Sequence, residues 1–533
     1  MFKVLKLSAV ALGAAVLAAC SSSVSSQTGT VSTSTAHGTL AQNPPFRIGS
    51  DNAAAVQALI GATAQGAYLL EHAGNPICGV DLYYITYWTV GAAGESTVSS
   101  GALMVPTGAA PACSGPRPIV LYAHATQFSQ TFNITNIQDP SNIEGQVLAA
   151  VFAAQGYIVV APNYAGYDIS TLGYHPFFNA VQQSGEMMDI LAAARTALPN
   201  TLSSAASDNG QLFLTGYSEG GFVAMATLRA MEAVGAKVTA AAPLSGLYAL
   251  EAETDLVMYG GVAWGGPEFI PLFANSYQHA YGNIVSAANP IFSTTYPDAL
   301  TVLPSTMPLD TLFQEGLLPD AAVFDSTTPV IAGEPALTAA LAIPSHPVDP
   351  LSNAGFGNPY LIENDYRVSY VEDAASNPDG AFPTPVAGVP VAKLKPTQGL
   401  RQDVYLNDLR NVAWIPTVPT LLCGGDEDPT VFFSLNAETM VAFWQAMPAW
   451  KALPPALTAE LVTVLDVSAT PAGAFAPLQT AFQEFEAGTV AELQTAAGGG
   501  LTLEAAEAQV LENYHTDVQP FCALGARAFF SHF

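Results

Sequence analysis

The sequence has little charge, and very little positive charge. Charged residues make up 11% of its 533 residues, and 14 lysines and arginines stand against 43 aspartates and glutamates, for a net charge of -29. A nucleic-acid partner is not expected, because a surface of this sign repels the phosphate backbone. The acidity can also serve solubility alone. Half of the residues are apolar, so the chain is able to bury a sizeable core.

Long hydrophobic runs are also lacking after the first twenty residues. The best candidate, 147–161, is short and is interrupted by Gln155 and Gly156, whereas a membrane span requires about twenty uncharged apolar residues. We therefore expect the body of the protein to contact a membrane only through an anchor at its start.

The first residues predict such an anchor. Lys3 and Lys6 precede a short apolar stretch, and Leu-Ala-Ala-Cys follows, ending at Cys20. This order is typical of a bacterial lipoprotein signal over 1–20, in which the cysteine is lipidated and becomes the first mature residue. An ordinary secretory signal with an incidental cysteine is the alternative. We expect an exported lipoprotein of the cell envelope, at the outer membrane where two membranes exist, with a flexible Ser/Thr-rich linker over 21–45.

Cysteine is scarce, with five in the chain and none in C-x-x-C spacing, which disfavours a cysteine metal site. Setting Cys20 aside leaves four thiols, and in an exported chain four thiols predict two disulfides with three possible pairings. We favour Cys78 with Cys113 and Cys423 with Cys522, because the second pair lies beside the two loops that are expected to carry the candidate acid and histidine described below. No metal and no cofactor is expected.

Strand-like and helical segments alternate through the first half of the chain. Residues 118–123 (PIVLYA) and 157–162 (YIVVAP) are rich in β-branched and aromatic residues, and a helical pattern over 144–155 separates them. The alternation continues with a helix at 185–198, a strand at 211–217, a helix at 222–234 and a strand at 238–244. It predicts an α/β fold, with a mostly parallel sheet and helices on both faces.

Two further features complete the predicted core. Segments 81–90 and 96–105 alternate in polarity and predict an antiparallel hairpin at the edge of the sheet. The strand pattern stops over 247–411, and because long loops without structure are uncommon, this segment predicts a large helical cap. Strand patterns return at 419–423 and 461–467, and an insert over 469–512 precedes the C-terminal segment. The α/β core is thus expected in two parts, 46–246 and 412–533.

The most informative motif is Gly-Tyr-Ser-Glu-Gly-Gly over 216–221. A strand pattern precedes it and a helical pattern follows, which is the context of a nucleophile elbow, a serine presented on a sharp turn between strand and helix. The glycines allow the tight turn, and the helix N-terminus stabilises negative charge. Ser218 is therefore the candidate nucleophile. A plain packing corner is the alternative, since G-x-S-x-G also arises by chance in a chain with 44 glycines.

A serine nucleophile requires a histidine base and a carboxylate that orients it, and in elbow-type hydrolases the acid and then the histidine follow the serine. His515 is the candidate base because it follows the last predicted strand, whereas His532 is the penultimate residue, where a base is poorly held. Asp428 is the candidate acid, in the loop after the strand that follows the cap, with Asp426 as the alternative. The run Asp426-Glu427-Asp428 is also compatible with a calcium loop, although the further ligands of an EF-hand are missing.

Hydrolysis by this route also requires an oxyanion hole with two N–H donors. One is expected from the backbone of Glu219, the residue after the nucleophile. The other is expected from the loop His124-Ala125-Thr126-Gln127 after the first central strand, where the amide of either Ala125 or Thr126 can supply it. His124 is expected to orient this loop rather than to act as a base.

Several segments together resemble the bacterial relatives of secretory lipases in the α/β-hydrolase superfamily. They are GYSEGG at 216–221, YAHAT at 122–126, APNYAGY at 161–167, GGDEDPTVFF at 424–433 and YHTDVQPFC at 514–522. The resemblance covers 75–250 and 415–533, and it implies an esterase or lipase with Ser218, Asp428 and His515 as its triad. The chain departs from the family pattern at Ala125, where glycine is usual, and in the long insert before His515.

These residues are compatible with three functions. The first is a serine ester hydrolase acting on small-molecule or lipid esters. Its cap aromatics would line an acyl pocket or belong to the core: Tyr248, Trp264, Phe269, Phe273 and Tyr277. The second is a capped serine peptidase, in which Glu251, Glu253 and Asp255 would bind an amino terminus. The third is a surface lipoprotein that uses the fold for binding without chemistry. The sequence indicates no oligomeric state.

Overall fold

A computed structural model describes residues 36–201, 206–286, 289–341, 350–379, 395–496 and 499–533. The predicted signal over 1–20, its Cys20 and the first part of the linker lie outside these residues, so anchoring through Cys20 stays a prediction. Within the described residues, no helix is long and apolar enough to cross a membrane.

Nine strands of the described residues form one sheet in the order β1-β2-β3-β5-β4-β6-β7-β10-β11. Their bounds are β1 (Phe46–Asp51), β2 (Gly79–Val90), β3 (Ser96–Thr107), β4 (Gly115–Ala123), β5 (Ile158–Pro162), β6 (Ala206–Tyr217), β7 (Ala240–Leu244), β10 (Thr420–Gly424) and β11 (Val462–Asp466). From β5 to β11 all neighbours are parallel, and β1, β2 and β3 pair antiparallel. The predicted parallel pair, β4 with β5, and the β2–β3 hairpin are confirmed.

The hairpin does not form the sheet edge as expected, because β1 pairs with β2 outside it. The predicted linker over 21–45 also ends too late. The N–H groups of Gly38 and Ala41 donate to the carbonyls of Trp88 and Thr86 at 2.8 Å, so residues 38–41 run along β2 instead of forming a free tether. Both corrections have one cause, the backbone groups that β2 leaves available on its outer side.

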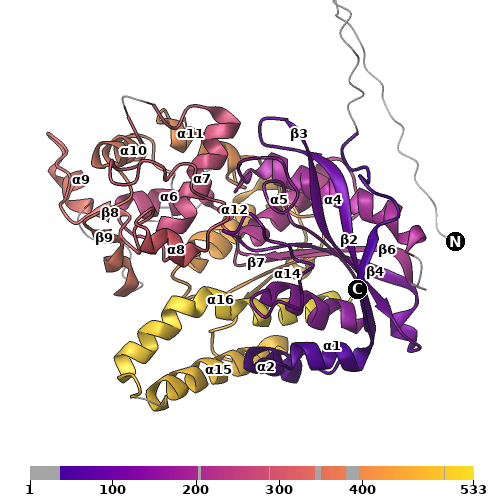
Figure 1. The fold of residues 1–533 in the computed structure, drawn as a ribbon. Helices are drawn as coiled ribbons and strands as arrows, with labels where there is room; N and C mark the ends of the chain where they lie inside the picture. The colour runs from indigo at the N-terminus through magenta and orange to yellow at the C-terminus, as the bar shows by residue number, and fades with distance from the viewer. Residues whose placement is uncertain (1–35, 202–205, 287–288, 342–349, 380–394, 497–498) are drawn as a thin grey trace, which may run out of the picture. The chain divides into compact units, whose positions relative to one another are not determined.

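Helices cover both faces of the sheet (Figure 1). On one face lie α4 (Ala180–Ala197), α5 (Glu219–Ala233) and, between β10 and β11, α12 (Thr439–Ala446) with the short α13 (Pro448–Lys451) and α14 (Pro455–Leu461). On the other lie α1 (Ala53–Ile60), α2 (Ala64–Ala73), α3 (Ile143–Val147) with a helical continuation to Gln155, α15 (Ala476–Thr495) and α16 (Leu503–Phe530). Alternate residues of β4 supply the two cores: Ile119 and Leu121 pack with α4 and α5, Val120 and Tyr122 with α16.

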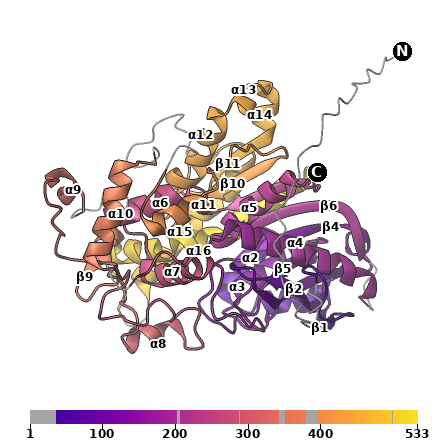
Figure 2. The ribbon, with the colours of Figure 1, turned by 90° about the horizontal axis from the view of Figure 1, so that it is seen from above.

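The described part of the segment between β7 and β10, which we call the cap, has short helices separated by long stretches without regular secondary structure. It contains α6 (Leu250–Tyr259), α7 (Gly266–Tyr281), α8 (Leu309–Gln314), α9 (Pro335–Ala340), α10 (Asn364–Ser376), α11 (Gly399–Asn407) and a two-stranded sheet of β8 (Phe324–Asp325) and β9 (Phe356–Gly357). Figures 1 and 2 show these elements beside the sheet, with α7 toward α5. Its interior holds a buried ion pair in which Arg401 of α11 contacts Asp255 at 2.9 Å and Glu251 at 3.0 Å, both on α6.

Both favoured disulfides are present. Cys78–Cys113 closes a separation of 35 residues near the start of β2, and Cys423–Cys522 closes one of 99 residues. The second bond ties the end of β10 to the middle of α16. It therefore joins the strand that leads to Asp428 to the helix that carries His515.

Candidate active site

Ser218 sits on a strained turn between β6 and α5. Its φ of 59° lies in the left-handed region, which a non-glycine residue adopts at a cost and which is typical of a nucleophile elbow. The flanking glycines are required sterically. A Cβ atom at Gly216 would lie 2.4 Å from the carbonyl oxygen of Gly220, and one at Gly220 would lie 1.9 Å from that of Ala123. The turn therefore presents Ser218 at the carboxyl end of β6, at the N-terminus of α5.

The structure brings Ser218, His515 and Asp428 together in one hydrogen-bonded chain. The Nε2 of His515 lies 2.8 Å from the Ser218 hydroxyl, and its Nδ1 lies 2.6 Å from Oδ2 of Asp428. Because a carboxylate accepts, Nδ1 carries the hydrogen, which leaves Nε2 to accept from Ser218. The other carboxylate oxygen of Asp428 accepts from the N–H groups of Thr430 at 2.9 Å and Val431 at 3.0 Å, so its orientation is held from both sides.

The alternative acid does not take part in this chain. Asp428 is buried, whereas Asp426 and Glu427 are exposed on the outer side of the loop. In the described part of the chain, no group of three or more His, Cys, Asp or Glu side chains could hold a metal ion, and the Asp426-Glu427-Asp428 run forms no such group.

His515 lies on a helix and not on a loop, which corrects the expected setting. It belongs to α16, and the hydroxyl of Tyr217 donates to its backbone carbonyl. Tyr217 directly precedes the nucleophile, so this contact joins the elbow to the helix. The insert over 469–512 and the C-terminal segment form the helical pair α15 and α16, which packs against the sheet. A packed helix holds the imidazole more firmly than a surface loop would.

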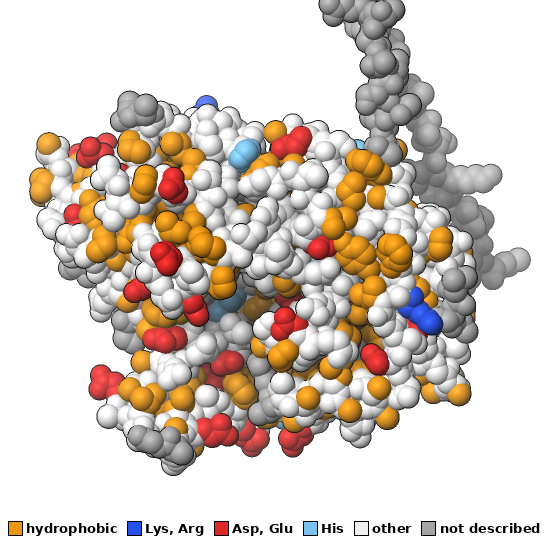
Figure 3. Space-filling model, viewed as in Figure 1, with side chains coloured by type: hydrophobic (Ala, Val, Ile, Leu, Met, Phe, Trp, Pro, Cys, Tyr) orange, Lys and Arg blue, Asp and Glu red, His pale blue; other side chains and the backbone are white. Residues whose placement is uncertain are grey.

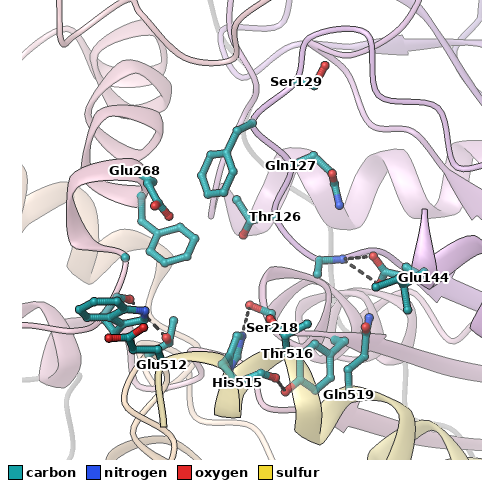
Figure 4. Close-up of a pocket in the computed structure, with 18 of the residues that line it drawn as sticks. Thr126, Gln127, Ser129, Glu144, Ser218, Glu268, Glu512, His515, Thr516 and Gln519 are labelled. Carbon is teal, nitrogen blue, oxygen red and sulfur yellow. Dashed lines mark hydrogen bonds between the residues drawn. The ribbon is translucent and has the colours of Figure 1, made fainter. Parts of the chain in front are cut away.

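The two candidate oxyanion amides of the 124–127 loop differ in their partners. The N–H of Ala125 donates to both carboxylate oxygens of Glu144, at 3.0 and 3.1 Å. Ala125 is therefore corrected as a donor, since its hydrogen is already engaged away from Ser218. Thr126 lines the cavity beside Ser218 (Figure 4). Its backbone amide therefore stays a candidate oxyanion donor, together with the amide of Glu219 at the start of α5.

Glu144 was not singled out from the sequence. Its carboxylate is buried, and besides Ala125 it accepts from the Tyr122 hydroxyl at 2.6 Å. Burial raises the pKa of Glu144 to about 7. A signal was available, because a carboxylate in the otherwise apolar segment 143–154 needs partners to be buried.

Glu219 and His175 form a second buried pair behind the elbow. The Nε2 of His175 lies 2.6 Å from Oε1 of Glu219, its Nδ1 lies 2.9 Å from the Ala165 carbonyl, and Gln183 also donates to Glu219 at 2.5 Å. Burial alone would lower the pKa of His175, but Glu219 beside it raises it above the ordinary value. These contacts hold the side chain of Glu219, so its backbone N–H keeps a fixed direction.

His124 orients the loop as expected. Burial lowers the pKa of His124 to about 4, so its ring is neutral and its Nδ1 donates to the Ala125 carbonyl at 2.6 Å. Its ring packs on Tyr164, with 4.1 Å between centroids.

Ser218 opens into a cavity of about 670 Å³ that lies between the core and the cap. The cap contributes Trp264, Glu268 and Phe269, and α16 contributes Glu512, His515, Thr516 and Gln519 (Figure 4). The space-filling view shows a hollow with histidine at its floor and acidic side chains around it (Figure 3). Of the cap aromatics considered above, Trp264, Phe269 and Phe273 line cavities, whereas Tyr248 and Tyr277 are buried in the core.

Comparisons with known proteins agree with this architecture. Residues 146–279 match the model of the prolyl oligopeptidase family. The crystal structure of the rice cell wall degrading esterase LipA from Xanthomonas oryzae superposes with a TM-score of 0.61 at 23% identity, over 93% of this chain and 98% of that one. A putative hydrolase from Legionella pneumophila superposes with a TM-score of 0.55 at 17% identity, over 91% of this chain and 96% of that one. The chain has the α/β-hydrolase fold.

The predicted resemblance is thus confirmed at the level of the superfamily. No curated protein matches the sequence. The family model and these two solved structures all describe hydrolases. The family model names a peptidase, the first structure an esterase, and the second a putative hydrolase without a stated substrate. They therefore support a hydrolase and leave the choice between ester and peptide to the chemistry of the site.

Proposed function

We propose that the protein is a serine carboxylester hydrolase. The observation that carries the proposal is the hydrogen-bonded chain from Ser218 through His515 to Asp428, with the serine on a strained elbow at the floor of a cavity. The order of the three residues along the chain is that of the elbow-type hydrolases.

The geometry supports a two-step reaction. The Ser218 hydroxyl attacks the ester carbonyl while Nε2 of His515 takes its proton, and the oxyanion accepts hydrogen bonds from the amides of Glu219 and Thr126. The tetrahedral intermediate collapses, His515 returns the proton to the leaving alcohol, and the acyl group stays on Ser218. Water, deprotonated by His515, then attacks the acyl carbon and releases the carboxylic acid and the free serine. Asp428 stabilises the imidazolium in both steps.

The proposal is tested with Ser218→Ala and Asp428→Asn. Loss of the nucleophile is expected to reduce turnover of p-nitrophenyl butyrate to background, and Asp428→Asn to lower kcat by about 10⁴, because the imidazole is then held in the wrong tautomer. Asp426→Asn is the matched control at the same loop and is expected to keep near wild-type kcat. Full esterase activity in Ser218→Ala would refute the assignment.

A fluorophosphonate probe that leaves Ser218 unlabelled in folded protein would favour binding without chemistry.

A serine peptidase is the second candidate, favoured by the match of residues 146–279 to the prolyl oligopeptidase family. The cap carboxylates do not support it. Glu251 and Asp255 are engaged by Arg401, and Glu253 is buried and accepts from the side-chain amide of Asn436. An amino terminus would therefore meet no free charged pair among these three acids. Faster cleavage of aminoacyl p-nitroanilides than of p-nitrophenyl esters would reverse the ranking.

A further inference from the structure

Two cavities, not one, meet at Ser218. The larger, of about 670 Å³, and the smaller, of about 100 Å³, share Ser218, Thr126 and Phe269 in their linings. An ester has two arms on either side of its carbonyl carbon. With that carbon at Ser218 and its oxygen toward Thr126, each arm has a cavity of its own.

The position of His515 decides which arm enters which cavity. His515 and its helix neighbours Thr516 and Gln519 line the larger cavity and not the smaller one. The leaving oxygen must receive its proton from His515, and the water of the second step must lose its proton there. The leaving alcohol therefore lies in the larger cavity, and the acyl chain, which stays on Ser218 while the alcohol departs, lies in the smaller one.

The smaller cavity fits a short apolar chain. Its lining is formed by aromatic and aliphatic side chains of the core and the cap: Phe177, Phe178, Leu250, Val257, Ile270 and Phe273. Phe178 and Phe273 contact each other, with 6.2 Å between ring centroids. The one acidic residue in this lining, Glu253, accepts from the side-chain amide of Asn436, and burial raises its pKa well above the ordinary value.

The larger cavity is polar and strongly acidic. Five acidic side chains line it, from four separate segments of the chain: Asp139, Glu144, Glu268, Asp320 and Glu512. Burial raises the pKa of Glu144 and Glu268 to about 7, so these two add fully to the negative charge only above that pH. Among its lining residues there is no lysine or arginine. An anionic leaving group would enter a field of its own sign, whereas a neutral polar or cationic group would not be repelled. The lining also contains Trp264, whose indole is a ring type that attracts cations.

We propose that the site selects esters in which a short apolar acid is joined to a large alcohol that is polar and carries no negative charge. The small cavity sets the acyl length, and the carboxylates of the large cavity exclude anionic alcohols. The inference rests on the proposed ester hydrolysis and specifies its substrate class.

The charge selection is tested with butyryl esters of three alcohols of similar size. Choline provides a cation, 3,3-dimethylbutanol its neutral counterpart, and an alkanol of the same length with a terminal sulfonate an anion. We expect kcat/KM for the sulfonate ester to be about tenfold or more below that for the neutral ester at low ionic strength, with the gap narrowing in 0.5 M salt. Equal values for the two esters at low salt would overturn the charge selection.

A matched pair of variants assigns the effect to the cavity. Asp320→Asn with Glu512→Gln is expected to narrow the ratio of kcat/KM between the neutral and the sulfonate ester. Glu507→Gln, an exposed acid on α16 outside the cavity lining, makes the same chemical change and is expected to leave the ratio as in wild type. A ratio that stays unchanged in the double variant would place the discrimination elsewhere and overturn the assignment.

Acyl length is tested with p-nitrophenyl esters, whose leaving group is constant. Wild type is expected to prefer butyrate to dodecanoate, and Phe273→Ala to move the optimum to longer chains, since it opens the small cavity. A preference for dodecanoate in wild type would overturn the acyl assignment. These outcomes differ from failure of the proposed function, in which wild type hydrolyses none of the esters, or Ser218→Ala hydrolyses them equally well.

Discussion

At the scale of single residues, the oxyanion loop depends on a carboxylate that contacts no substrate in the proposed reaction. Glu144 accepts from the Ala125 N–H and from the Tyr122 hydroxyl, and so engages the Ala125 amide that would otherwise be available to an oxyanion. Because the Ala125 N–H is engaged by Glu144, the amide of Thr126 is the one that the proposed reaction uses from this loop. Glu144 is thus a positioning residue for the oxyanion hole.

Replacing Glu144 tests this role. Glu144→Ala leaves Ala125 N–H and the Tyr122 hydroxyl without their acceptor, and we expect kcat for p-nitrophenyl butyrate to fall by about tenfold to a hundredfold, below the 10²–10³ that loss of an oxyanion donor costs. KM should change little, because the ground-state ester gains little from the oxyanion hole. Glu144→Gln keeps an oxygen for the Ala125 N–H and should restore most of kcat. Equal losses in both variants, or a loss in KM alone, would contradict the positioning role.

The triad could be predicted from the sequence because chemistry restricts it strongly. Ser218 is recognisable from the glycines that its turn requires, and the fixed chain order then selects Asp428 and His515. Glu144 and His175 could not be found in this way. They act through contacts with a backbone amide and a buried carboxylate, which only the packed structure defines.

At the scale of elements, the Cys423–Cys522 bond joins β10, the strand that leads to Asp428, to α16, the helix that carries His515. Chain-entropy reasoning assigns about 4.7 kcal/mol to a closed loop of 100 residues, although strain and residual structure alter such values. Replacing both cysteines with alanine is expected to lower Tm and also kcat, because α16 is then less firmly held against β10.

The other disulfide is a control of the same kind. Cys78–Cys113 closes a shorter loop and lies near β2, away from Ser218. Its double alanine variant should lower Tm and leave kcat near that of wild type. Thermal melting and steady-state kinetics on both variants check the prediction. Equal kcat in the two would show that the Cys423–Cys522 bond does not position the site.

Elements of the parallel core were predictable because their apolar runs are short, rich in β-branched residues and separated by helical patterns. The edge strand β1 was missed, since its sequence Phe-Arg-Ile-Gly-Ser-Asp is not strongly apolar and its pairing is decided by β2. The setting of His515 was missed for a similar reason. The helix α16 contains Pro520 and changes from an exposed polar half to a buried half, which obscures a single helical pattern.

At the scale of the whole molecule, the excess of acid is carried partly by buried carboxyl groups. Burial raises the pKa to about 7 for five of them, in the core, the cap and α15 and α16: Glu144, Glu268, Asp403, Glu486 and Asp517. In each, the folded state holds its proton to a higher pH than the unfolded chain does. The contribution of these groups to the free energy of unfolding is full below about pH 4 and is lost as pH rises from there through 7, so that the last part of the loss falls between pH 6.5 and 8.

We therefore expect Tm to fall between pH 6.5 and 8. His175, whose pKa is also raised, makes the free energy of unfolding fall with pH in the same way. The pKa of His124 is instead lowered to about 4, which makes the free energy of unfolding rise with pH, but only below about pH 6.5. Thermal melts at several pH values across this window measure the slope. Asp517→Asn removes one of the five groups and should flatten it, whereas Glu507→Gln, an exposed acid on the same helix, should not. A Tm that rises from pH 6.5 to 8 would mean that these carboxyl groups are not held protonated by the fold.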